Sequence, residues 1–456
     1  MFSRHDVPLS RAAMWGASIN LERREMEWCK EVQGVELAQY QLDALDTLLL
    51  GGGLLSLDTG LGKTLATVSA CITLSTQYGK RCFICAPVNA LGAWQPYIET
   101  LQQHFEEVAL VSIDSLHKLK GLSSEEGGVV VWDEVHLLGE ATTKRTKEAH
   151  DLRRKFDIGI ALTGTLLHAG VKKALSILDL VVPGLSLFSS FWAAGEYFHC
   201  LVKKEIDGVG TVTDLEKPTG PNFENFADYV TRCGAIVKKH SEAAKEAGIP
   251  AQHSETIKLG EPWGSIEDCV VEWARQYVAE HNEFPQVQTA VAALRREGLD
   301  KKLEWLTMWL TQNKEPVVLF GWSLESLATM QQYLQSLAMP YVYVDGGVTG
   351  KNRVQAVEDF QQGKVDIFLG QIDASCVSVN LYRARYSIAL EHTNRSANYD
   401  QALGRTCRRG QHQECYHYDL VTNPLQLKVL ERLRAGVNFD SSVAEWATMR
   451  DTIYNL

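Results

Sequence analysis

The sequence predicts an α/β fold with two tandem lobes, each a parallel sheet flanked by helices. Short apolar segments alternate with longer helical segments in both halves of the chain, which is typical of parallel strands joined by crossover helices. A stretch rich in glycine and proline separates the two series, as expected for an irregular connection. The 456 residues are enough for two or three domains with cores of their own.

Composition narrows the classes of function. Hydrophobic residues make up 45% of the chain and charged residues 22%, as in globular proteins, and no apolar run is long enough to cross a bilayer. The first residues lack the apolar core of a signal peptide. The net charge of −11 excludes a global attraction to nucleic acid or membrane, so local basic patches must hold any polyanion.

Ten cysteines are scattered without a disulfide framework. Cys82 and Cys85 form one CxxC pair, but they lie in an apolar segment that reads as a strand, where positions three apart face opposite sides. No second pair completes a zinc site. We therefore expect structural thiols in a reducing, intracellular compartment.

The first 34 residues carry no motif, and we place lobe 1 at residues 35–250. Its first apolar segment, Leu54 to Leu57, leads into a glycine-containing loop, a Gly-Lys-Thr triplet and a helix start, which is the phosphate-loop arrangement. Glycines let backbone N–H groups turn inward around anionic oxygens, and a helix N-terminus adds positive charge there. The predicted nucleotide contacts of this loop are Thr59, Gly60, Gly62, Lys63 and Thr64.

Within this loop, Lys63 would reach the β- and γ-phosphates and the Thr64 hydroxyl would ligate Mg²⁺. One departure is visible, because the general pattern has glycine five residues before Gly62 and this chain has Leu57. The alternative is a glycine-rich strand–helix turn that binds nothing.

Four more strands are expected in lobe 1, at residues 82–86, 108–112, 129–132 and 158–162. The third ends in Asp133-Glu134-Val135-His136. A carboxylate at this end of a strand beside a phosphate loop can anchor Mg²⁺, which we assign to Asp133. Glu134 would orient and polarise the attacking water as general base, and His136 would link the site to the next motif. The alternative is a polar loop after a buried strand.

Residues 205–222 are dense in Gly, Pro and Asp and predict a loop or hairpin. Another break at 247–250 marks the boundary with lobe 2, residues 251–456. Apolar residues at helical spacing over 303–310 predict its leading helix. Strands are expected at 317–321, 341–345, 366–370, 386–390 and 416–420.

A basic segment near the end of lobe 2 carries Gln401, Arg405 and Arg408. Their i, i+4, i+7 spacing would put them on one face of a helix. Two guanidinium groups there could reach a γ-phosphate and stabilise transition-state charge as an arginine finger. The alternative is a solvated basic helix face.

Together these motifs resemble helicase superfamily 2, and the remaining ones resemble its Swi/Snf-like branch. The resemblance covers about residues 35–425 and implies two RecA-like lobes with an ATP cleft between them. Motif VI is the most diagnostic match, and motif III has Leu166 where the family usually has Pro. The similar segments are Tyr40-Gln41 (adenine-side Gln motif), 86–94 (Ia), 162–168 (III), 318–322 (IV), the Asp345, Arg353, Phe360 and 367–369 spacing, and 401–411 (VI).

Motif V departs from the family pattern. Asn380 and Leu381 fit, but Ser375, Cys376 and Ser378 stand where the family has glycines. This affects the expected geometry of strand contact and lobe coupling, not the ATPase assignment.

By the same resemblance, residues of both lobes should face a nucleic-acid strand. Basic residues at 144–147 and 153–155 offer sequence-independent phosphate contacts. Trp94 and Trp322 fit equally well as core aromatics. The strand-facing candidates are Trp94, Lys144, Arg145, Trp322, Arg353 and Asn380.

The resemblance implies an ATP-driven DNA translocase or helicase that remodels forks and junctions in replication, recombination or repair. We expect ATP and Mg²⁺ as cofactors, duplex or branched DNA as a sequence-independent partner, and a monomer. The expected location is the cytoplasm of a bacterium or a phage-infected host. Two alternatives are an RNA helicase of the same superfamily and a non-motor module that ATP switches between binding states.

Overall fold

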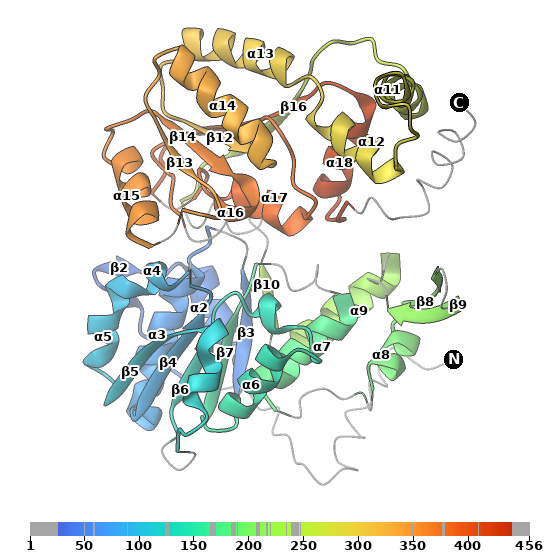
Figure 1. Cartoon of the computed structure of the whole chain (residues 1–456). Helices are drawn as coiled ribbons and strands as arrows, with labels where there is room; N and C mark the ends of the chain where they lie inside the picture. The colour runs from blue at the N-terminus through green and yellow to red at the C-terminus, as the bar shows by residue number, and fades with distance from the viewer. Residues whose placement is uncertain are drawn as a thin grey trace. The chain divides into compact units, whose positions relative to one another are not determined.

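The computed structural model describes residues 26–49, 51–57, 60–88, 90–123, 127–164, 170–183, 188, 190–206, 210–215, 218, 220–233, 235–238, 246, 248–348, 350–375, 379–408 and 410–439. The chain divides into two compact units, residues 1–247 and 248–456, called lobe 1 and lobe 2 below. Each lobe contains its own sheet (Figure 1). None of the described helices is both long and apolar enough to cross a membrane.

Lobe 1 contains a six-stranded sheet in which every neighbouring pair is parallel. The predicted strands are present with ends that shift by at most two residues. The strand that sequence reasoning missed is the short edge strand β10. In sheet order the strands are β10 (Ala235–Lys238), β3 (Gly52–Leu57), β7 (Ile158–Leu162), β6 (Val129–Trp132), β4 (Arg81–Ala86) and β5 (Glu107–Ser112).

Helices cover both faces of this sheet because its central strands are buried on both sides. One face is covered by α3 (Lys63–Tyr78), which also contacts α2 (Gln39–Leu45) and α5 (Ile98–Gln102). The other face carries a continuous apolar cluster. Its helical contributors include α6 (Lys144–Arg153), α7 (Gly170–Val181), α8 (Phe191–Tyr197) and α9 (Gly220–Arg232).

Short elements complete lobe 1. Near its start is a two-stranded antiparallel pair, β1 (Glu31–Val32) and β2 (Val35–Glu36). The one-turn helix α4 (Leu91–Trp94) follows β4 and runs into the 3-10 helix η2 (Gln95–Tyr97). Two further 3-10 helices, η3 (Ile113–Leu119) and η4 (Val135–Leu138), follow β5 and β6.

The predicted hairpin begins four residues earlier than expected. Strands β8 (Leu201–Ile206) and β9 (Gly210–Leu215) form an antiparallel pair, and α9 already begins at Gly220. The predicted loop therefore contains regular structure, because Gly210 begins β9, and Gly220 and Pro221 begin α9. Residues 207–209 lie outside the described part of the chain.

Lobe 2 also contains a six-stranded sheet with parallel neighbours throughout. The predicted strands are again present. The sequence did not predict β11. This edge strand is exposed to water, so it contains no run of apolar residues that would mark it as a strand. The order is β11 (Gln252–Lys258), β16 (Cys415–Val421), β15 (Tyr386–Ala389), β12 (Val317–Gly321), β14 (Ile367–Gln371) and β13 (Tyr341–Val344).

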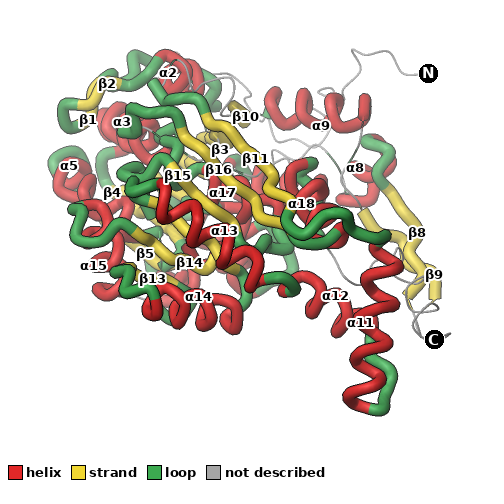
Figure 2. Tube along the Cα trace, turned by 90° about the horizontal axis from the view of Figure 1, so that it is seen from above, coloured by secondary structure: helices red, strands yellow, loops and turns green. Residues whose placement is uncertain are grey.

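Three apolar clusters organise the helices of lobe 2. One face of the sheet packs against α13 (Leu299–Gln312), the predicted leading helix, and α14 (Leu324–Ser336). The other packs against α15 (Gly350–Gln361), α16 (Ile372–Ser375) and α17 (Ser396–Leu403). A third group forms one end of the lobe, where α11 and α12 extend away from the sheet (Figure 2). It consists of α11 (Ile266–His281), α12 (Val287–Arg296) and α18 (Pro424–Arg434).

Candidate functional site

The order of strands in lobe 1 brings four motifs to one edge of the sheet. The phosphate loop follows β3, motif III follows β7, the Asp133 motif follows β6 and motif Ia follows β4. These four strands are consecutive neighbours, although the motifs occur in a different order along the chain. Because the strands are parallel, all four motifs leave the carboxyl edge of the sheet, where α/β proteins bind ligands.

The phosphate loop has the backbone that its glycines allow. Gly60 and Gly62 have φ angles of 91° and 72°, in the left-handed region that disfavours side chains. Helix α3 begins at Lys63 with Gly62 as its N-cap, so the first N–H groups of the helix face the loop. The Lys63 ammonium donates to the Leu57 carbonyl at 2.6 Å. Thr64 is partly exposed, and Thr59 lies outside the described residues.

Two side chains of α2 donate hydrogen bonds to backbone carbonyls of this loop. The Tyr40 hydroxyl donates to the Leu61 carbonyl at 2.7 Å. The buried Gln41 amide donates to the carbonyls of Leu61 and Gly62 at 3.1 and 3.2 Å, and its oxygen accepts from the Ala38 N–H at 2.9 Å. Gln41 therefore shapes the loop, and its predicted contact with the nucleotide stays a prediction.

Asp133 is a buried carboxylate with a donor on each oxygen. The indole nitrogen of Trp94 donates to Oδ2 at 2.8 Å, and the backbone N–H of Glu134 donates to Oδ1 at 2.9 Å. Burial, followed by the neighbouring Glu134 carboxylate, raises the pKa of Asp133 to about 6, against the hydrogen bond from Trp94 and the charge of Lys63. Occupation by a cation would favour the ionised form.

Glu134 and His136 connect motif II to motif III. Glu134 has a φ of 49°, an uncommon conformation for a residue with a side chain, and such residues cluster at functional sites. Its carboxylate lies 3.3 Å from Nδ1 of His136. The same nitrogen lies 3.4 Å from the Thr163 hydroxyl at the end of β7. The link from His136 to the next motif is therefore present as predicted.

These residues fit Mg²⁺ and a nucleoside triphosphate. No group of three or more His, Cys, Asp or Glu side chains that could hold a metal occurs among the described residues. A cation at this edge would have the Asp133 carboxylate and the Thr64 hydroxyl, with the remaining ligands from phosphate and water. That is how Mg²⁺ is commonly held beside phosphates. The positive-φ glycines and the start of α3 suit the anionic groups.

Trp94 does not face a nucleic-acid strand, so this prediction is wrong. Its side chain is 0% exposed, and its indole nitrogen donates a hydrogen bond to Asp133. The reason is the sheet order: β4, which leads into α4, pairs directly with β6, which leads into Asp133. The acidic residue after the neighbouring strand thereby supplies an acceptor for the buried indole N–H.

The predicted basic patches of lobe 1 are only partly available. Lys144 is exposed at the start of α6. Arg145 pairs with Asp114 at 2.9 Å and donates to the Leu137 carbonyl. Arg153 is 3% exposed and donates to backbone carbonyls, so its assignment to a surface patch is wrong. A buried guanidinium with five donors can satisfy several carbonyls at once.

In lobe 2, the motif VI arginines meet at one carbonyl. Helix α17 ends at Leu403 with Gly404 as its C-cap, so Arg405 and Arg408 lie past the helix and the predicted shared helix face is wrong. They converge through the turn instead, and both donate to the Val379 carbonyl, at 3.4 and 3.3 Å. Burial, followed by the charge of Arg405, lowers the pKa of Arg408 to about 9. Gln401 is buried on α17.

Asp373 is a residue that sequence reasoning missed. It follows β14 on α16 and accepts from the Trp322 indole at 3.0 Å, the Thr393 hydroxyl at 2.5 Å and the Asn398 amide at 2.7 Å. It thereby joins motif IV to the segment after β15 and to helix α17 at one carboxylate. The signal was available, since Asp373 follows an apolar strand in lobe 2 much as Asp133 does in lobe 1.

The other predicted DNA contacts of lobe 2 differ in availability. Trp322 is half-buried, and the Arg295 guanidinium stacks 4.1 Å from its ring centre. Arg353 donates to the Ala374 carbonyl at 2.5 Å. Asn380 is exposed. Of the substituted positions of motif V, Cys376 and Ser378 lie outside the described residues, and Ser375 is the last residue of α16.

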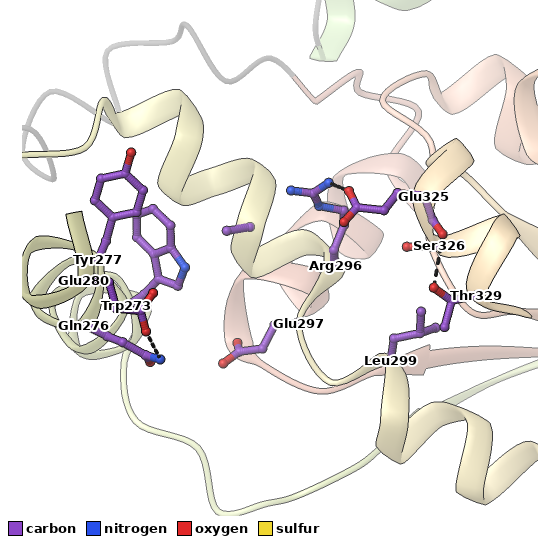
Figure 3. Close-up of a pocket in the computed structure, with 11 residues that line it drawn as sticks. Trp273, Gln276, Tyr277, Glu280, Arg296, Glu297, Leu299, Glu325, Ser326 and Thr329 are labelled. Carbon is purple, nitrogen blue, oxygen red and sulfur yellow. Dashed lines mark hydrogen bonds and ion pairs between the residues drawn. The ribbon is translucent and has the colours of Figure 1, made fainter.

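A separate pocket of about 430 Å³ lies within lobe 2 (Figure 3). Trp273 and Tyr277 of α11 form one side of it, and Glu325 of α14, which pairs with Arg296, forms another. None of the residues that line it is among the predicted site residues.

The comparisons with known proteins support the motifs. Residues 300–410 match the helicase conserved C-terminal domain. Human chromodomain-helicase-DNA-binding protein 1 is 24% identical over 91% of this chain and 27% of its own length. The mouse chromodomain-helicase-DNA-binding protein 1-like is 22% identical over 83% of this chain and 47% of its own length. The chain thus spans less than half of either relative.

Two further similarities are more limited. The DNA repair and recombination protein RAD54-like of Drosophila virilis is 28% identical over 29% of this chain and 17% of its own length. The Sulfolobus solfataricus SWI2/SNF2 ATPase core in complex with dsDNA aligns with 95% of this chain and 96% of its own, at 17% identity and a TM-score of 0.39. The motifs, the match to the helicase conserved C-terminal domain and the chromodomain-helicase relatives thus make the chain similar to the Swi/Snf-like branch of helicase superfamily 2.

Proposed function

We propose that this protein is an ATP-driven DNA translocase that remodels branched DNA such as forks and four-way junctions. The observation that carries the proposal is the carboxyl edge of lobe 1, where the phosphate loop and the Asp133-Glu134 pair follow strands of one sheet. Phosphoryl transfer depends mainly on positioning and charge stabilisation, and this edge supplies both.

Each charged residue has a distinct role in the proposed hydrolysis. Lys63 binds the β- and γ-phosphates once it leaves the Leu57 carbonyl. Asp133 and Thr64 would hold Mg²⁺, which supplies neutralisation of phosphate charge when bound. Glu134 orients and polarises the attacking water, with His136 beside it. Arg405 or Arg408 stabilises the charge of the transition state.

DNA is the proposed track. The names of the relatives, a chromodomain-helicase-DNA-binding protein and a DNA repair and recombination protein, support DNA over RNA. With a net charge of −11, binding must use exposed cations such as Lys144 and polar groups such as Asn380. Contacts of this kind are independent of base sequence and weaken with salt.

Branched DNA is favoured over plain duplex by energetics. Branch migration breaks one base pair for each one it forms, so its net pairing energy is near zero. Unwinding plain duplex must supply about 1–2 kcal/mol per base-pair step. The described part of the β8–β9 hairpin carries no aromatic residue that could split strands. A motor with these two lobes therefore suits moving a junction better than separating a duplex.

The test compares ATPase rates with single-stranded DNA, duplex, forks, four-way junctions and RNA. Gel assays then follow conversion of labelled junctions and of blunt duplex of equal length, with ATP and with a non-hydrolysable analogue. We expect DNA-stimulated hydrolysis, and junction conversion that requires hydrolysis. Activity on RNA duplexes without activity on DNA junctions would favour the RNA helicase. Slow hydrolysis that does not depend on DNA length would favour the non-motor switch.

A further inference from the structure

We propose that Trp94 is a positioning residue for the metal-binding carboxylate: its indole N–H fixes the orientation of Asp133 and so sets how well the site holds Mg²⁺ with nucleotide. This inference rests on the proposed function. In this proposal Trp94 of motif Ia supports the nucleotide site of lobe 1, and its burial excludes the nucleic-acid contact expected of it.

The contact is short and sheltered. The Trp94 indole nitrogen lies 2.8 Å from Oδ2 of Asp133, within the range of a good N–H···O hydrogen bond. Trp94 is 0% exposed and Asp133 is 9% exposed, so water competes poorly for either partner. An indole nitrogen can only donate, so the direction of this bond is unambiguous.

The two donors on Asp133 act as a pair. Trp94 holds Oδ2 and the Glu134 N–H holds Oδ1, so rotation of the carboxylate about its last bond would break at least one of them. Each carboxylate oxygen has two lone-pair sites. One hydrogen bond on each oxygen therefore leaves a lone pair free to bind a cation. The same two hydrogen bonds fix the orientation of the carboxylate.

Losing the N–H would free one side of this carboxylate. Groups that orient a metal ligand typically change metal affinity by about 10–100-fold when they are removed. The rings themselves also fill the core, so a variant that deletes the indole would confuse packing with positioning. The informative change removes only the N–H.

The chain offers a matched control one residue from the site. Trp132 is also 0% exposed, and its indole nitrogen has no hydrogen-bond partner among the described groups. Trp132→Phe therefore makes the same change in size, on the neighbouring strand β6, without removing a hydrogen bond. Trp94→Phe and Trp132→Phe share the packing effect and differ in the contact with Asp133.

The experiment measures binding of a fluorescent ADP analogue by the full chain across a Mg²⁺ titration and in EDTA, with thermal melting of each protein. For Trp94→Phe we expect the half-saturating Mg²⁺ concentration to rise about 10–100-fold, with unchanged binding in EDTA. Trp132→Phe should match the wild type. If Trp94→Phe melts early, a benzothienyl analogue of tryptophan at position 94 replaces the N–H with sulfur at constant ring shape, and we expect the same shift.

Two results would overturn the inference alone: a wild-type Mg²⁺ dependence in the folded Trp94 variants, or an equal shift in Trp132→Phe. Absence of Mg²⁺-dependent nucleotide binding in the wild type would instead overturn the proposed function, and the inference with it. The wild-type titration thus separates the two failures.

Discussion

The side-chain amide nitrogen of Gln41 lies 3.1 Å from the carbonyl oxygen of Leu61, in the middle of the phosphate loop. The same nitrogen lies 3.2 Å from the Gly62 carbonyl. A Cβ atom on Gly62 would come within 2.5 Å of it, so glycine at this position is required by the clamp as well as by its φ of 72°. Helix α2 and the phosphate loop are therefore shaped for one another.

Gln41→Ala should loosen the phosphate loop. The change leaves the Leu61 and Gly62 carbonyls without this donor, and loss of a buried partner costs about 1–3 kcal/mol. We expect a lower melting temperature and a higher KM for ATP. Gln39→Ala is the control, because Gln39 is exposed on the same helix and contacts Asp43 instead. Equal behaviour of the two variants would remove Gln41 from the loop's support.

Lys63→Ala should abolish ATP hydrolysis, because it removes the charge that meets the β- and γ-phosphates. DNA binding without nucleotide should stay nearly intact. ATPase rates and nucleotide-free DNA binding check the two parts, with the exposed Lys80→Ala as control. Wild-type turnover by a clean preparation of Lys63→Ala would rule out this nucleotide site.

Glu134→Gln should bind ATP and fail to turn it over. The amide keeps the shape of the carboxylate and loses the base, a contribution of about 10²–10⁴ in rate. Binding of ATP and single-turnover rates separate the two effects. The control is Glu140→Gln, which changes a carboxylate paired with Lys172 in the same lobe. Loss of nucleotide affinity with little change in rate would make Glu134 structural.

Arg405→Ala or Arg408→Ala should lower the rate about 10³-fold or more if that residue is the finger. ATP affinity should fall less, because a finger acts chiefly on transition-state charge. Melting curves are needed alongside, since Arg405 is buried. Arg395→Ala, which changes an exposed arginine beside α17, should turn over normally. Near-normal DNA-stimulated rates in both motif VI variants would exclude either as the finger.

Acid should destabilise lobe 2 through Asp419. This buried carboxylate accepts from His392, His417, Tyr399 and Arg434. Burial alone would raise the pKa of Asp419, but His417 and His392 outweigh it and hold the pKa well below its usual range. The unfolded chain therefore binds the proton first, and the stabilisation is lost as the pH falls below about 4.

The check is urea unfolding of the wild type and Asp419→Asn between neutral pH and pH 3. Breaking a buried ion pair costs about 3–5 kcal/mol, so Asp419→Asn should be the less stable protein at neutral pH. The difference should shrink in acid, because the unfolded wild-type chain takes up a proton at Asp419 that the folded protein does not. A difference that stays constant with pH would contradict the assigned ionisation.

The sequence predicted the strands and the motif loops well because their signals are local. An apolar run bounded by polar residues is readable at β6 or β12 without knowing its neighbours. Contacts between motifs were harder. The bond from Trp94 to Asp133 depends on β4 lying beside β6, and chain order alone does not contain that adjacency.

Two other failures have local causes. Spacing placed Arg405 and Arg408 on a helix, but Gly404 ends α17 before them, as glycine commonly does. A run of charges suggested a surface patch at residues 153–155, yet Arg153 is buried among carbonyls that need donors. In both places the backbone decides the outcome, because its hydrogen-bonding groups must find partners that a pattern of residue types does not show.

The Lys63 ammonium donates a hydrogen bond to the Leu57 carbonyl. If Lys63 binds a phosphate oxygen, that oxygen replaces the Leu57 carbonyl as the acceptor of the ammonium. The affinity for nucleotide therefore reflects the difference between the contact of Lys63 with phosphate and its contact with the Leu57 carbonyl, and not the whole attraction between lysine and phosphate. A phosphate oxygen must therefore be a better acceptor than the Leu57 carbonyl before Lys63 adds to the affinity for a ligand.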